Sequence, residues 1–146
     1  MGFSVPQKAS YCTLSMSTDQ LNPAAGATVA FDTEDQAGGD LSRSTNDITG
    51  FKAGKVYQIM LKVAIIHTAN AYMTFELYDT TAAATVGPVI NAVTTSYSAT
   101  HQNAQETIVW PFIPAADTSL RVRVYGRTAN CDIDAASGVP QTFTVF

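Results

Sequence analysis

The chain has 146 residues and a mass of 15.5 kDa, which is about the size of one ordinary domain. Hydrophobic residues make up 46% of it, but charged residues make up only 14%, well below the average of roughly 25%. Eight Lys and Arg against twelve Asp and Glu give a net charge of −4. This balance excludes a coiled coil, a charge-rich disordered chain and a basic nucleic-acid-binding protein.

The first nine residues, 1–9, have no place in the strand pattern that follows. We expect them to form an arm ahead of a single domain, 10–146. They lack the charged and then apolar run of a secretory signal. The longest apolar stretch of the chain, 59–66, is interrupted by Lys62 and is far shorter than a membrane span. These features predict a soluble protein with no membrane partner, made either without export or after processing that the sequence does not show.

Three segments, 56–65, 72–79 and 120–125, alternate between apolar and other side chains, as half-buried strands do. The residues expected to face the core are Tyr57, Ile59, Leu61, Val63, Ile65, Met73, Phe75, Leu77, Leu120, Val122 and Val124. In the last segment, Arg121 and Arg123 alternate with the apolar residues and are expected to point outward.

Weaker alternation predicts further strands at 11–16, 28–31, 88–93, 106–112 and 142–146. Clusters of Gly, Asp and Asn separate these segments and are typical of turns. No window of the chain has the apolar stripe of a helix. About eight short strands with this spacing predict an antiparallel sandwich or barrel.

The two cysteines, Cys12 and Cys131, lie far apart in the sequence. A disulfide needs Cα atoms within about 7 Å, so the two can pair only if their strands are neighbours. We favour two buried, reduced thiols and leave the disulfide open as the alternative. No Cys and His cluster has the spacing of a zinc site.

No set of residues predicts catalysis. His67 and His101 each lie just beyond a predicted strand, without a second candidate ligand two or four residues away. No serine lies in a Gly-x-Ser-x-Gly motif. We therefore predict that the protein is not an enzyme and has no catalytic residue and no cofactor.

Acidic residues gather at two places, around the Gly38 and Gly39 turn and next to Cys131. They are Asp32, Glu34, Asp35, Asp40, Asp132 and Asp134. Their spacing does not match the twelve-residue calcium loop with its closing Glu. We interpret them as solvated side chains and predict no metal site, while a metal on a symmetry axis is left open.

Arg121, Arg123 and Arg127 surround Tyr125 and form the basic patch of the sequence. Interleaved Arg and Tyr occur on platforms that stack nucleic acid bases, but they are equally enriched at protein interfaces. Because the chain is negatively charged overall, we favour an interface or a solvated face over nucleic acid.

The aromatic residues point to association. Alternation forces some of them outward, because they cannot all enter one small core. The aromatic residues that cannot all enter the core are Tyr72, Tyr78, Trp110 or its neighbour Phe112, Tyr125 and Phe146. Exposed apolar patches usually mark interfaces, so we predict an obligate oligomer with aromatic contacts between subunits. The alternative is a second sheet that packs on the same face.

Three segments carry motifs of a known structural family. In 31–62, an Asn-containing loop precedes a short β element, and an F-x-A…G-x-Y pattern opens a long core strand. The matching residues are Ile48, Phe51, Ala53, Gly54 and Tyr57. Two residues separate Gly54 from Tyr57, where the family usually has one. Segment 112–122 is similar to a Phe…Leu-x-x-Gly-Asp-x-Leu-x-Val run, with Pro114 and Ala116 in place of its Leu and Gly, and 142–146 fits a last, central strand. Together these segments resemble the C1q/TNF-like jelly-roll family.

The resemblance implies an all-β, antiparallel jelly-roll sandwich of about eight to ten strands that assembles as a trimer. In relatives, the positions of Met60 and Phe112 face the threefold axis. Met60 also stands alone among polar neighbours on its face of the strand. The resemblance and the outward aromatics together give these candidates for a trimer or capsid interface: Met60, Trp110, Phe112, Tyr125 and Phe146.

Within this family the chain is similar to the trimeric cement or decoration proteins of tailed-phage heads. It is poor in charge and rich in Thr, Ala and Asn, and its short arm is suited to lie on a neighbouring subunit. The resemblance implies a homotrimer, made in the host cytoplasm, that binds the major capsid protein on the virion surface and stabilises the head. A receptor- or glycan-binding knob of a phage fibre is the alternative. An enzyme on a jelly-roll scaffold is disfavoured by the isolated histidines, and a major capsid protein by the small size.

Overall fold

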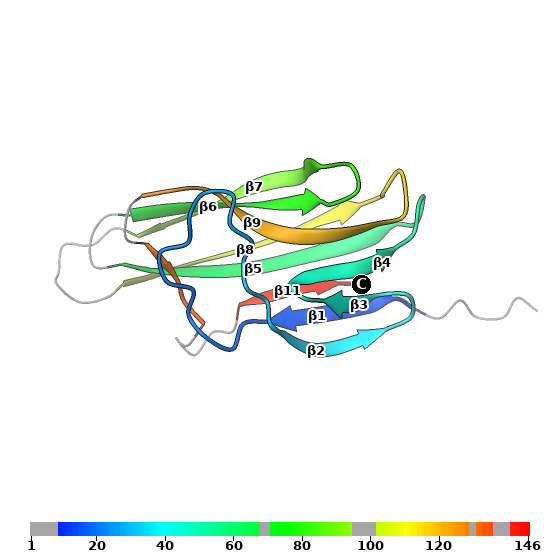
Figure 1. The fold of residues 1–146 in the computed structure, drawn as a ribbon, viewed down its shortest axis with the longest axis horizontal. Helices are drawn as coiled ribbons and strands as arrows, with labels where there is room; N and C mark the ends of the chain where they lie inside the picture. Colours follow the sequence, from blue (N-terminus) through cyan, green and yellow to red (C-terminus); the bar gives the residue numbers. More distant parts are fainter. Residues whose placement is uncertain (1–8, 68–70, 95–101, 129–130, 136–140) are drawn as a thin grey trace, which may run out of the picture.

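The computed structural model describes residues 9–67, 71–94, 102–128, 131–135 and 141–146. Within these ranges the chain forms eleven β-strands and no helix (Figure 1), so the all-β prediction is confirmed. Accordingly, the described part contains no helix that is long and apolar enough to span a membrane. The predicted arm, apart from Ala9, lies outside the described residues.

The strands form two antiparallel sheets that make a jelly-roll sandwich (Figure 1). Sheet A consists of β1 (Tyr11–Ser15), β2 (Thr33–Gly38), β5 (Tyr57–His67), β8 (Gln102–Phe112), β10 (Asp132–Ile133) and β11 (Thr142–Val145). Sheet B consists of β3 (Ser42–Ser44), β4 (Asp47–Phe51), β6 (Ala71–Asp79), β7 (Ala84–Thr94) and β9 (Thr118–Arg127). In sheet A, β8 pairs with one edge of β5, while β11 and β10 share its other edge and β1 and β2 follow beyond β11. The order in sheet B is β3-β4-β9-β6-β7.

The core lies between the two sheets and is filled by their inward side chains. Every residue that the alternation of the three strong strands placed inward is buried, so this prediction is confirmed. The ring of Phe51 in sheet B packs edge-on against Tyr57 and Phe112 in sheet A, with centroids 4.9 and 5.7 Å apart. These aromatic contacts join the sheets at one end of the sandwich.

Trp110 and Phe112 both point into the core, and the expectation that one of them is an outward aromatic is wrong. Their residues are only 8% and 9% exposed. The reason is the register of β8, which places Phe112 opposite Tyr57 and Trp110 opposite Ile59. Cross-strand partners share one face of a sheet, and Tyr57 and Ile59 face inward.

Two segments differ from their predicted structure. Segment 28–31 is not a strand, although Thr28 makes a single bridge to Arg123 of β9. The turn predicted around Gly38 and Gly39 is present at Gly39 and Asp40, but the acidic segment before it is strand β2, which pairs with β1 at the edge of sheet A. Charged side chains are common on edge strands, where they oppose pairing with another chain.

Strand β4 was not found by alternation because Gly50 interrupts it. Gly50 has a φ of 94°, in the left-handed region that favours glycine, and the ladder to β9 shifts between Thr49 and Phe51. A Cβ atom on Gly50 would collide with the backbone carbonyl of Asp40. The glycine therefore lets the preceding loop pack closely on β4 while Phe51 turns into the core.

Candidate self-association face

The outer face of sheet A is apolar along β5 and the edge strand β8, toward the end of the sheet where Phe146 lies. Met60 of β5 lies between Val109 of β8 and Thr144 of β11, and it is half-buried. Two backbone hydrogen bonds join Gln58 to Phe146, which places the C-terminal ring beside this strand. The alternation of β5 and β8 extends the same face in both directions. We call the following residues the apolar face: Val56, Met60, Val109, Pro111, Ile113 and Phe146.

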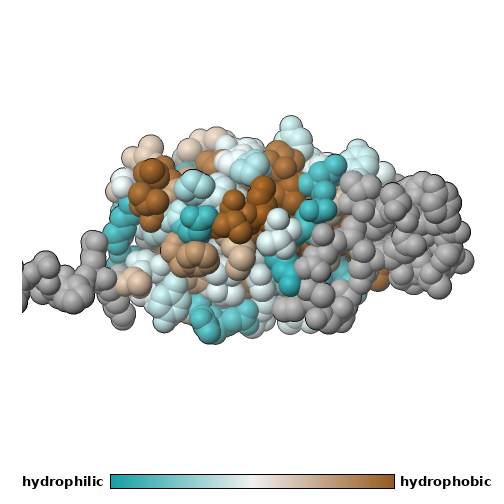
Figure 2. All heavy atoms as spheres, turned by 180° about the vertical axis from the view of Figure 1, so that it is seen from behind, coloured by the Kyte–Doolittle hydropathy of each residue, from teal (hydrophilic) through white to brown (hydrophobic). Residues whose placement is uncertain are grey.

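Most of the apolar face is open to solvent in the single chain. Val56 is 70% exposed, Val109 51%, Ile113 60% and Phe146 55%. From behind, hydrophobic side chains extend from the left end of the domain to its middle, with hydrophilic side chains between them (Figure 2). Lys62, which follows Met60 on the outer side of β5, gives the face a polar border. Gln58, which lies between Val56 and Met60 and pairs with Pro111, is a polar residue within the face. Clusters of exposed apolar residues usually mark an association surface.

The five interface candidates are divided among three environments. Met60 and Phe146 lie on the apolar face, as just described. Tyr125 is 60% exposed but belongs to β9, on the outer face of the opposite sheet. Trp110 and Phe112 are core residues. The candidates therefore do not form one surface.

Sequence reasoning missed Val56, Val109, Pro111 and Ile113, which make up most of the apolar face. A signal for two of them was present. Val109 and Pro111 alternate with Trp110 in β8, so placing the large ring inward would have placed these two outward.

The arginines of β9 are held by acidic partners. Arg121 pairs with Asp47 at 2.7 Å, and Arg123 pairs with Glu76 through two of its nitrogens. The Arg123 guanidinium also stacks over the ring of Tyr78, 3.5 Å from the centroid. The outward direction predicted for both arginines is confirmed, but their charges are paired within the chain. This pairing does not favour a phosphate-binding surface.

The two longer motif segments meet in space. The Tyr57 hydroxyl accepts a hydrogen bond from the backbone N–H of Lys52, and Gly54 turns the chain between them with a φ of 73°. Asp117 accepts hydrogen bonds from the N–H of Ala53 at 2.9 Å and from the Lys52 ammonium at 3.0 Å. These donors hold the pKa of Asp117 below its usual range. Through these hydrogen bonds, the two motif segments connect the end of β4 to the beginnings of β5 and β9.

The acidic residues near β2 have separate partners. The backbone and hydroxyl of Ser17 both donate to Asp32 and lower its pKa. Asp35 accepts from Ser15, and Glu34 accepts from the backbone N–H of Arg43. Among the described residues, no group of three or more His, Cys, Asp or Glu could hold a metal ion. The His67 side chain and all of His101 lie outside what the structure describes.

Cys12 and Cys131 are free and buried, as the favoured interpretation predicted. Burial raises the pKa of Cys12 to about 12 and that of Cys131 to about 11, and the nearby carboxylates of Glu34 and Asp132 act in the same direction. Only thiolates react readily with alkylating reagents, so both cysteines should be unreactive toward these reagents in the folded chain.

We expect no alkylation of either cysteine by iodoacetamide in the native protein at pH 8, because both pKa values lie far above that pH. Intact-mass spectrometry measures the modification. The same reaction in guanidinium chloride is the control and should label both thiols. Rapid labelling of the native protein would show that these thiols are accessible.

The fold has known counterparts, although no protein-family model and no curated protein matches the chain. The globular domain of zebrafish complement 1qA is similar over 94% of this chain and 93% of its own, with a TM-score of 0.52 and 12% sequence identity. Murine APRIL is similar over 93% of this chain and 96% of its own, with a TM-score of 0.51 and 10% identity. At such identities the likeness concerns the fold alone.

Proposed function

We propose that this C1q/TNF-like jelly roll is a non-catalytic structural domain that works as a homotrimer, and that the trimer decorates a phage capsid. The observation that carries the first part is the apolar face. It occupies one side of sheet A, and Val56, Val109, Ile113 and Phe146 are each more than half exposed in the single chain. Burying such side chains is the main favourable term in obligate association.

The resemblance of the motif segments to C1q/TNF-like proteins favours three copies over two. In such an arrangement the outer faces of three A sheets meet around a threefold axis. Met60 then lies within the contact, because β8 and β11 of the same sheet flank it on both sides. Tyr125 stays outside the contact, on the opposite sheet.

The capsid role rests on the composition of the chain, which is low in charge, at 14%, and rich in Thr, Ala and Asn, as many phage structural proteins are. A trimer presents each of its remaining surfaces three times. Weak contacts with several capsid subunits would then add up to strong overall binding.

The first test measures the mass of the protein in solution. Native mass spectrometry and light scattering at micromolar concentration should give three times 15.5 kDa. A protein that is monomeric under these conditions would overturn the trimer.

The second test concerns the partner. The trimer should co-sediment with purified, expanded tailed-phage capsids and not with the unassembled major capsid protein. A trimer that does not bind capsids but binds the host cell surface would instead support a fibre knob.

A further inference from the structure

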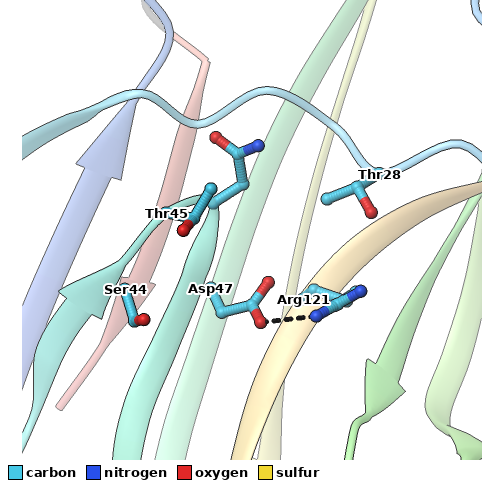
Figure 3. A pocket seen from close by; sticks show the side chains of 6 residues that line it. Thr28, Ser44, Thr45, Asp47 and Arg121 are labelled. Atoms are coloured by element: carbon cyan, nitrogen blue, oxygen red, sulfur yellow. Dashed lines mark hydrogen bonds and ion pairs between the residues drawn. The ribbon is translucent and has the colours of Figure 1, made fainter.

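A polar cavity lies on the opposite sheet from the apolar face, at the β3–β4 hairpin (Figure 3). Its volume is about 370 Å³, within the size range of small-molecule sites. It is lined by Thr28, Ser44, Thr45, Asn46, Asp47 and Arg121. No large apolar side chain takes part, which distinguishes it from the usual apolar ligand pocket.

The lining has unused hydrogen-bonding capacity. Within the described part of the chain, the side chains of Ser44, Thr45 and Asn46 make no hydrogen bond to the rest of the protein, and Arg121 donates only to Asp47. In Figure 3, the Asp47 carboxylate and the Arg121 guanidinium are in direct contact on one side of the cavity, with Thr28 above them. Donors and acceptors are thus available together in a small space.

Thr45 supplies a second, independent observation. It is the first residue of the two-residue turn between Ser44 and Asp47, and its φ is 59°. A β-branched residue rarely adopts a positive φ, and hairpin turns of this kind usually place glycine there. Strained residues are concentrated at functional sites. The turn therefore keeps a threonine side chain on the cavity at the expense of local stability.

The charges of the cavity exclude an anion as the preferred ligand. The single cation, Arg121, is already neutralised by Asp47 at 2.7 Å, and an anion would also meet this carboxylate. A neutral ligand rich in hydroxyl groups suits the site better, because each hydroxyl can donate to Asp47 and accept from Arg121.

A second polar cavity, of about 300 Å³, lies farther along β4 and β9 and shares no lining residue with the first. Thr49 and Ser119 line it and are joined by a hydrogen bond of 2.9 Å. They lie two residues from Asp47 and Arg121, so the two cavities are about 7 Å apart along the strands. Lys52 and Asp117, which form an ion pair of 3.0 Å, line the far end of the second cavity. We call the two cavities together the polar groove.

We propose that the polar groove binds a neutral oligosaccharide, with one sugar unit over the Asp47–Arg121 pair and the next toward Ser119. The inference goes beyond the proposed structural role and does not depend on it, because all the contacts come from one chain. In a trimer joined through sheet A, the three grooves would remain open on the outside. Individually weak sites would then act together on a polymeric glycan.

The test uses saturation-transfer NMR on the full chain with maltohexaose, mannotriose, chitotriose and N-acetyllactosamine. We expect saturable binding of at least one of them in the millimolar range. Sialyllactose and inorganic sulfate are the anionic comparisons and should bind more weakly. If no neutral probe binds below about 10 mM, or if sulfate competes for the same signals, the proposal is overturned.

Two variants locate the binding site. Asp47→Asn removes the charged acceptor and should weaken binding roughly tenfold or more. Asp40→Asn is the matched control, because Asp40 also forms an exposed ion pair, with Lys55 at 3.2 Å, but lines neither cavity. Equal affinity in the two variants would place the saccharide elsewhere and contradict the proposal.

Thr45→Gly separates function from folding. Removing the strain should raise Tm by roughly 2–4 °C, while loss of the hydroxyl should weaken saccharide binding by about three- to tenfold. A variant that is stabilised and binds as well as the wild type would show that Thr45 takes no part. Because the oligomer is measured separately, a failed saccharide test leaves the proposed trimer unaffected.

Discussion

Met60→Asp is expected to convert the proposed trimer into a folded monomer. Met60 lies at the middle of the apolar face, with Val109 and Thr144 on its two sides. In the trimer, an aspartate there would be an unpaired charge in a desolvated contact, which costs several kcal/mol per subunit. In the monomer the same side chain would reach water from the outer face of the sheet, so the fold should survive.

Light scattering measures the loss of the trimer, and circular dichroism confirms that the variant remains folded. Tyr125→Asp is the matched control, since Tyr125 is 60% exposed on the opposite sheet. It should leave the trimer intact. Phe112→Asp is unsuitable for this purpose, because Phe112 packs against Phe51 in the core and its replacement would unfold the chain. A Met60→Asp protein that is still fully trimeric would exclude the apolar face as the interface.

Much of the fold was predictable because the central strands carry a strong period of two. In β5, β6 and β9 the buried residues alternate almost without exception, so the inward and outward faces of these strands could be assigned from the sequence. The turn motif around Phe51 and Tyr57 was also recognisable, because it resembles C1q/TNF-like proteins. These features depend on neighbours in the sequence, whereas the hydrogen bond from Ala53 to Asp117 spans 64 positions and was not predicted.

The candidate site was less predictable because it depends on register. Whether Trp110 or Val109 faces the core is decided by the partner of β8, and a one-residue shift exchanges the two faces. The large ring was therefore assigned to the surface, and the smaller Val109 and Pro111 were overlooked. The polar groove was invisible for a related reason, since Asp47 and Arg121 are far apart in the sequence and meet only across the β4–β9 pair.

The partners of Arg121 and Arg123 could not be predicted from the sequence either. Alternation correctly predicted that Arg121 and Arg123 point outward, which suggested an interface or a solvated face. Their acidic partners lie on neighbouring strands, Asp47 on β4 and Glu76 on β6. The partner of Arg123 is buried despite its outward position, with only 3% of its side chain exposed. An outward residue on a strand is thus not always a solvated one.

This burial leads to the largest expected effect on stability. Arg123→Met should lower the free energy of unfolding by about 3–5 kcal/mol, because it leaves the Glu76 carboxylate buried without its cation. The hydroxyl of Thr85 still donates to Glu76, but one neutral donor does not replace a guanidinium. The stacking of Arg123 on Tyr78 is lost as well. Urea denaturation of the variant and the wild type measures the difference.

Two further variants separate the buried charge from simple loss of an arginine. Arg121→Met removes the more exposed pair with Asp47, whose side chains are 36% and 16% exposed, and should cost only about 1 kcal/mol. Combining Arg123→Met with Glu76→Gln removes both charges, so the double variant should be more stable than Arg123→Met alone. If the double variant is instead less stable than Arg123→Met, the cost does not arise from an uncompensated carboxylate. The role of Arg123 would then be limited to its packing on Tyr78.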